Sequence, residues 1–147
     1  MTVVYESLVS KTSSSKLTTG TLFNYTGSIE IVSLIGRVST IIQDQAQTAR
    51  IYITPDSLTA YNICAATSIR AFAAGTLLSL TGTASDSIVA TTAVGTIAPG
   101  QANPIYATCV TSGVIGVTFN PSASSTGAVV WELRWNRLNQ GATVTAA

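Results

Sequence analysis

Alternating apolar and polar residues run through most of the chain and predict short β-strands separated by turns. The clearest case is the stretch GAVVWELRWNRLNQGATV, from Gly127 to Val144. Side chains alternate across a strand, so this stretch should carry one apolar and one polar row. The apolar row consists of Val129, Trp131, Leu133 and Trp135. The polar row consists of Val130, Glu132, Arg134 and Asn136. The pattern predicts a central strand that buries both tryptophans of the protein.

The stretch SIEIVSLIGRVSTII, residues 28–42, is apolar on both faces of the strand that it predicts. One row consists of Ile29, Ile31, Ile35 and Ile41, and the other of Val32, Leu34, Val38 and Ile42. Either both faces are covered, which an oligomer achieves most easily, or a bulge near Val32–Ser33 reverses the phase. The many β-branched residues and Gly36 argue against a helix here.

Further strands are predicted at intervals along the rest of the chain. In ARIYI, Ile51 and Ile53 should point inward, and Arg50 and Tyr52 outward. Other short strands are expected at 61–65, 68–72, 76–82, 105–110 and 114–119. With no convincing helix and with Gly and Pro at the turns, the pattern indicates an all-β protein, an antiparallel β-sandwich of jelly-roll type. Residues 21–147 should form this single domain.

Residues 1–20 differ from the body of the chain. The segment ESLVSKTSSSKLTTG is polar, has no sustained period and contains both lysines, Lys11 and Lys16. It is interpreted as an extended N-terminal arm that becomes ordered on a partner. The alternative is a disordered terminus with one short strand at Val3–Val9.

The charge content is low. Charged residues make up 9% of the chain, against about 25% in an average globular protein. The net charge is +1 without a basic stripe, which argues against nucleic-acid binding. Weakly charged surfaces repel each other little, so the composition favours a subunit of an assembly over a quiet monomer. Neither a secretory leader nor a membrane-spanning apolar run is recognisable, so we expect a soluble protein made in the cytoplasm.

Catalytic chemistry is scarce in this sequence. Histidine is absent, which removes the commonest general base and zinc ligand. Cys64 and Cys109 are the only cysteines, and we expect them to be free and buried. The six acidic residues are scattered singly. We therefore predict no enzyme, no cofactor and no metal site.

The charged residues Glu132, Arg134 and Arg137 are the candidates for a contact with another subunit, together with Lys11 and Lys16 of the arm. Arginine is enriched at interfaces. The alternative for Glu132 and Arg134 is a plain surface pair that contributes a few tenths of a kcal/mol. A tryptophan platform for sugar stacking is a third reading, but it requires an exposed tryptophan.

Three runs of the sequence resemble a family of small β proteins encoded among the virion genes of tailed phages. The runs are GSIEIVSLIGRVSTIIQDQAQ, AAGTLLSLTG and STGAVVWELRWNRLNQGATVTAA. The family opens on G-x-I-x-I…G-x-V-x-T-x-I-Q, here Gly27, Ile29, Ile31, Gly36, Val38, Thr40, Ile42 and Gln43. It continues with T-G-x-[IV]-x-W-x-L, here Thr126, Gly127, Val129, Trp131 and Leu133. Its tail, G-A-x-V-x-A-A, matches Gly141, Ala142, Val144, Ala146 and Ala147.

The resemblance covers about residues 22–147 and has one departure, Arg137 where the family often has proline before the leucine. It implies a virion structural protein, and the expected role is that of a capsid decoration (cement) protein on the capsid surface. The expected partners are the major capsid protein and further copies of the chain, as a homotrimer. The alternative is a tail or head-fibre component that binds a host-surface glycan, for which Tyr5, Tyr25, Tyr52, Tyr61 and Tyr106 are the candidate aromatic residues.

Overall fold

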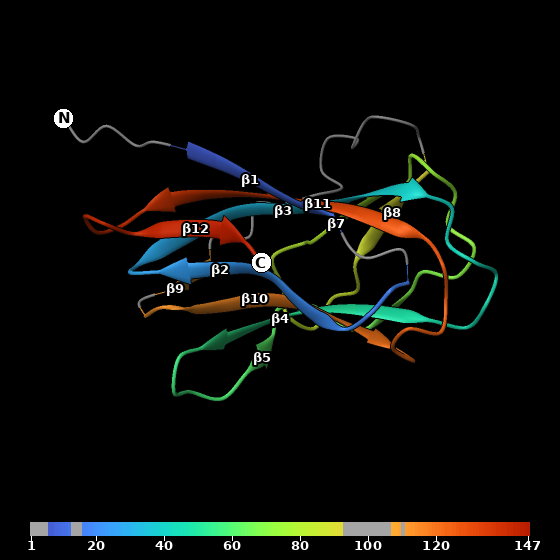
Figure 1. Cartoon of the computed structure of the whole chain (residues 1–147), viewed down its shortest axis with the longest axis horizontal. Helices are drawn as coiled ribbons and strands as arrows, with labels where there is room; N and C mark the ends of the chain where they lie inside the picture. Colours follow the sequence, from blue (N-terminus) through green and yellow to red (C-terminus); the bar gives the residue numbers. More distant parts are fainter. Residues whose placement is uncertain (1–5, 13–15, 93–106, 110) are drawn as a thin grey trace.

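Two antiparallel sheets packed face to face make up the computed structural model, which describes residues 6–12, 16–92, 107–109 and 111–147 (Figure 1). The β11 sheet has the order β1-β11-β3-β7-β8, with β9 also paired to β3. Its strands are β1 (Glu6–Thr12), β3 (Ile29–Thr40), β7 (Leu77–Ser79), β8 (Val89–Thr91), β9 (Ala107–Cys109) and β11 (Ala128–Arg137). The described residues contain no helix.

The β10 sheet has the order β12-β2-β10-β4-β5, with β6 also paired to β4. Its strands are β2 (Gly20–Thr26), β4 (Thr48–Pro55), β5 (Tyr61–Asn62), β6 (Thr67–Ser68), β10 (Gly113–Asn120) and β12 (Thr143–Ala146). The chain crosses from one sheet to the other between each of the first four strands, and again on both sides of β11. The predicted all-β sandwich is confirmed, and the jelly-roll detail stays a prediction.

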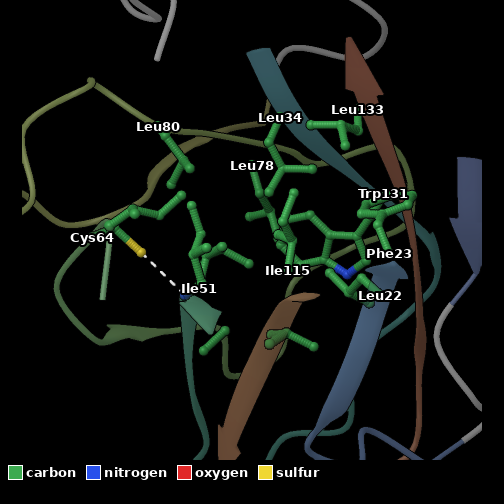
Figure 2. Close-up of a cluster of buried hydrophobic side chains, with 14 of the residues drawn as sticks. Leu22, Phe23, Leu34, Ile51, Cys64, Leu78, Leu80, Ile115, Trp131 and Leu133 are labelled. Atoms are coloured by element: carbon green, nitrogen blue, oxygen red, sulfur yellow. Dashed lines mark hydrogen bonds between the residues drawn. The ribbon is translucent and has the colours of Figure 1, made fainter. Parts of the chain in front are cut away.

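Strand β11 is central, as its pattern predicts. It pairs along its length with β1 on one side and β3 on the other. The inward row is buried, with exposed fractions of 0% for Val129 and Leu133, 1% for Trp131 and 6% for Trp135. Figure 2 shows Trp131 next to Leu22 and Phe23 of the β10 sheet, and Leu133 next to Leu34 in the same buried cluster. Because both tryptophans are buried, the hypothesis that they form a platform for sugar stacking is wrong.

A bulge in β3 explains why residues 28–42 are apolar on both faces. Ser33 pairs with Arg134 but Ile31 pairs with Trp135, so Val32 has no partner in the register. The extra residue reverses the phase, and Ile29 and Ile31 then share the buried side with Leu34. Of the two explanations for this stretch, the bulge at Val32–Ser33 is the one that the structure bears out.

A second bulge lies in β2. Ile115 pairs with Phe23 and Gly116 with Thr21, which leaves Leu22 without a partner. Leu22 and Phe23 are consecutive and both are buried, which simple alternation does not allow. The bulge thus adds one large side chain to the core beneath Trp131 (Figure 2).

The described part of the N-terminal segment packs against the sandwich. Strand β1 pairs antiparallel with β11 over seven positions, from Glu6 opposite Asn136 to Thr12 opposite Val130. Leu17 is fully buried, and its amide donates to the carbonyl of Ser125 at 3.1 Å. In this structure β1 is an edge strand of the body, and the first half of the predicted Val3–Val9 strand lies outside the described residues.

The three strands predicted between residues 61 and 82 form only in part. Strands β5 and β7 lie within 61–65 and 76–82, but β6 ends at Ser68, so the strand predicted at 68–72 is wrong. Ile69 is buried between exposed neighbours, which imitates alternation. Ala71 has a φ of 59° and turns the chain, which ends the extended conformation.

We expect that Gly36→Ala destabilises the protein by about 1–3 kcal/mol, the usual cost of overpacking a core. Gly36 lies opposite Trp131 in the register, and a methyl group there would be 2.8 Å from Cζ3 of the indole. Urea unfolding followed by tryptophan fluorescence measures the effect. Gly20→Ala is the matched control because a methyl group at Gly20 meets nothing within 4 Å. Equal unfolding midpoints for the two variants would refute this packing.

Candidate interaction surfaces

Glu132 and Arg134 point away from the core on the outer side of β11. Both side chains are exposed, while Trp131, Leu133 and Trp135 between and beside them are buried. The alternation predicted from the sequence is therefore confirmed at these positions. Their role in a contact is a separate question, which depends on what surrounds them.

Neighbouring strands add apolar and basic groups around this pair. Leu8 of β1 lies opposite Arg134 and is 58% exposed. On the other side, Ile35 lies opposite Glu132 and Arg37 opposite Val130. Residues directly opposite each other on an antiparallel pair are close enough for their side chains to interact. We call this surface the β11 face and define it by Leu8, Ile35, Arg37, Val130, Glu132 and Arg134.

The other predicted contact residues lie elsewhere. The Nζ of Lys11 donates to the backbone carbonyl of Ala147, so this side chain links the edge of the β11 sheet to the end of β12. Lys16 is exposed and forms a β-bridge with Thr126, just before β11 begins. Arg137 is exposed at the opposite end of β11. The five candidates therefore do not form one cluster.

The outer side of the β10 sheet carries a hollow of about 420 Å³. Its lining residues are Thr48, Arg50, Ala66, Thr118, Phe119, Asn120 and Ser122. Strand alternation predicts that Arg50 and Tyr52 point outward, and the burial of Ile51 and Ile53 confirms this prediction. The hollow itself could not be predicted from the sequence, because its walls come from strands about 70 residues apart and only their register brings them together.

The two cysteines are free and buried, with exposed fractions of 2% for Cys64 and 5% for Cys109. Burial raises the pKa of the Cys64 thiol, and a hydrogen bond from the Ile51 amide to Sγ, 3.3 Å long, opposes this effect only in part (Figure 2). Burial also raises the pKa of Cys109. Both thiols therefore stay protonated at neutral pH, and a protonated thiol is a poor nucleophile.

The tyrosines are placed very differently from one another. Tyr25 is buried and its hydroxyl has no hydrogen-bond partner of normal geometry. Burial, and next the nearby Cys109 thiol, raise the pKa of Tyr25. Tyr61 is 44% exposed and Tyr52 is half-buried. Tyr5 and Tyr106 lie outside the described residues.

Within the described ranges, no group of three or more His, Cys, Asp or Glu side chains is placed to hold a metal ion. Nor do these ranges contain a helix long and apolar enough to span a membrane.

Comparisons with known proteins identify no relative. No family model, no curated protein sequence and no solved structure matches the chain. The surfaces described above therefore have to carry the functional argument.

The raised pKa values predict that the protein loses stability in alkaline solution. In the unfolded chain the thiols ionise near their ordinary pKa of 9.0, and the folded protein holds these protons more tightly. The contribution is complete below about pH 8 and decreases as the pH rises through the unfolded and then the folded pKa. Urea unfolding at pH 7.5, 9 and 10.5 should show a free energy of unfolding that decreases slightly between pH 7.5 and 9 and more strongly between pH 9 and 10.5.

The double variant Cys64→Ala and Cys109→Ala should lose less stability between pH 7.5 and 10.5 than the parent, because two of the groups with raised pKa are gone. Tyr25 and Tyr61 remain and account for the rest. An alkaline loss of the same size in the parent and the double variant would show that the thiols do not contribute.

Proposed function

We propose that this chain is a structural subunit of a virus particle, a capsid decoration protein that binds the shell of the major capsid protein of a tailed phage. The phage assignment comes from the sequence resemblance described above. The structural part of the proposal is supported by the two-sheet sandwich, whose two thiols are buried in the core. Such a protein acts through its surface.

The observation that carries the proposal is the construction of the β11 face. Its central strand is hydrogen-bonded on both sides and anchored from below by Trp131 and Trp135. Side chains on such a strand are held in place before a partner arrives, so binding orders little of the backbone. A rigid surface of this kind is suited to a permanent contact.

The chemistry of the β11 face fits a protein partner. It combines an exposed leucine, two half-buried aliphatic side chains and charges of both signs. Interfaces between subunits combine apolar side chains with charged ones, arginine above all. Glu132 and Arg134 lie two positions apart on the same strand, so the face also offers complementary charges to another copy of itself.

Symmetry allows many weak contacts of this kind to hold the protein firmly on the shell. A decoration protein that occupies joints between capsid subunits binds many equivalent sites, and an oligomer engages several of them together. We propose a homo-oligomer, a trimer, for this reason. Its mass in solution tests this part of the proposal.

The shell-binding test uses Glu132→Gln and Arg134→Gln. Each variant should bind shells assembled from the major capsid protein about tenfold more weakly than the parent, because each loses a charge on the central strand of the contact. Cosedimentation of shells with increasing concentrations of the variant measures the affinity. The difference should narrow at high salt, since salt screens charge pairs.

Arg70→Gln is the control for this experiment. Arg70 is exposed and pairs with Asp44 at 2.5 Å, and both residues lie in loops outside the strands that carry the β11 face. It loses the same charge as Arg134→Gln and should bind shells like the parent. If all three variants bind like the parent, or if the parent does not bind shells at all, the proposal is wrong.

A glycan-binding tail or head-fibre component is the second candidate function. The specific observation that favours it is the hollow around Arg50, on the opposite side of the molecule from the β11 face.

A further inference from the structure

The hollow of about 420 Å³ on the outer side of the β10 sheet is built around an unpaired cation. Arg50 is half-buried, and its side chain makes no hydrogen bond or ion pair with the described part of the chain. Among the described residues that line the hollow, none is acidic. A guanidinium in a hollow without a counter-ion favours the binding of an anion.

Neutral polar groups surround this cation. Thr118 of β10 lies directly opposite Arg50 of β4, and Asn120 lies opposite Thr48 in the next row of the same face. The Thr118 hydroxyl and the Asn120 side-chain amide have no partner in the described part of the chain. The site therefore offers a donor–acceptor hydroxyl and an amide next to one positive charge.

A ring lies beside the hollow. Tyr52 follows Arg50 by two positions on β4, so the two side chains leave the same face about 7 Å apart. The phenol of Tyr52 lies across the sheet over Gly116: a methyl group on Gly116 would be 2.3 Å from its Cζ and Oη. Because the ring lies across the sheet and is only half-buried, its outer side is available to a ligand.

We propose that Arg50, Thr118, Asn120 and Tyr52 bind an acidic saccharide, a pyranose that carries a carboxylate. The guanidinium would take the carboxylate in a bidentate pair, and the hydroxyl and amide would take sugar hydroxyls. Tyr52 would carry the apolar face of the adjacent ring.

The single positive charge of Arg50 matches the single negative charge of a carboxylate. A phosphate carries up to two charges and is bound by several donors or cations, whereas Arg50 is the one cation among the described residues that line this hollow. A carboxylate from a protein side chain would satisfy Arg50 but would leave the hydroxyl, the amide and the ring unused. The combination of groups therefore favours a sugar acid.

This inference does not depend on the placement of the protein on a capsid. The proposed saccharide site lies on the outer side of the β10 sheet, and the β11 face lies on the outer side of the other sheet. Failure of one proposal therefore leaves the other untouched, and the two sets of variants distinguish them.

The test is a titration of the ¹⁵N-labelled full chain with trigalacturonic acid and with sialyllactose, followed by NMR chemical shifts. We expect at least one of them to bind with a Kd of about 1 mM, with shifts centred on β4 and β10. The neutral counterparts, galactotriose and lactose, should bind at least about tenfold more weakly, because they lack the carboxylate.

Arg50→Gln should weaken binding of the acidic saccharide about tenfold and abolish the preference over its neutral counterpart. Tyr52→Ala should weaken both the acidic and the neutral saccharide, because it removes the ring. Tyr52→Phe keeps the ring and should retain the ring's contribution that Tyr52→Ala loses. Arg70→Gln, outside the hollow, should bind like the parent. Thermal unfolding of each variant checks that the fold is retained, and Tyr52→Leu, which also lacks the ring, serves where Tyr52→Ala fails to fold.

Three results would overturn the inference. One is the absence of shifts for both acidic saccharides at 10 mM. Another is unchanged binding by Arg50→Gln. The third is binding of triglutamate or inorganic phosphate as tight as that of the better saccharide, which would assign the hollow to a protein carboxylate or to a simple anion instead.

Discussion

The contact of Trp131 with Gly36 is the constraint on which the arrangement of the two sheets depends. The indole of β11 lies over the one position of β3 that has no side chain, and any larger residue there would overlap it. This fixes the height of the tryptophan above its own sheet, and therefore the space that the β10 sheet has to fill. The bulge in β2 supplies two consecutive buried side chains, Leu22 and Phe23, at that place.

The sandwich has two different outer surfaces, because the two sheets bury their inward side chains in one common core. Next to each buried residue of a strand is a residue that points outward. On β11 the outward neighbours are Glu132 and Arg134, and on β4 they are Arg50 and Tyr52. The first surface combines charges of both signs with aliphatic groups. The second has a hollow in which Arg50 is the one charged residue of the described lining. The two surfaces therefore suit different partners.

Strong alternation within a single strand could be predicted from the sequence, and pairing between strands could not. The buried row of β11 and the outward position of Arg50 and Tyr52 follow from local order alone. The phase of β3 depends on which residue of β11 lies opposite Val32, so the sequence left two explanations open. The prediction of a strand at 68–72 is wrong because Ala71 adopts a left-handed backbone conformation, which turns the chain and which the apolar pattern does not reveal. The hollow required the register of β4 against β10, as did the neighbours Leu8 and Arg37 of the β11 face.

The back-to-back position of the two sheets has a geometric consequence. A molecule that docks through the outside of the β11 sheet turns the outside of the β10 sheet away from its support, into the surrounding medium. The outer sides of the two sheets can then accept substitutions independently, since the buried core separates them. In a lattice of such molecules, every copy would expose the same outer side of the β10 sheet to the medium.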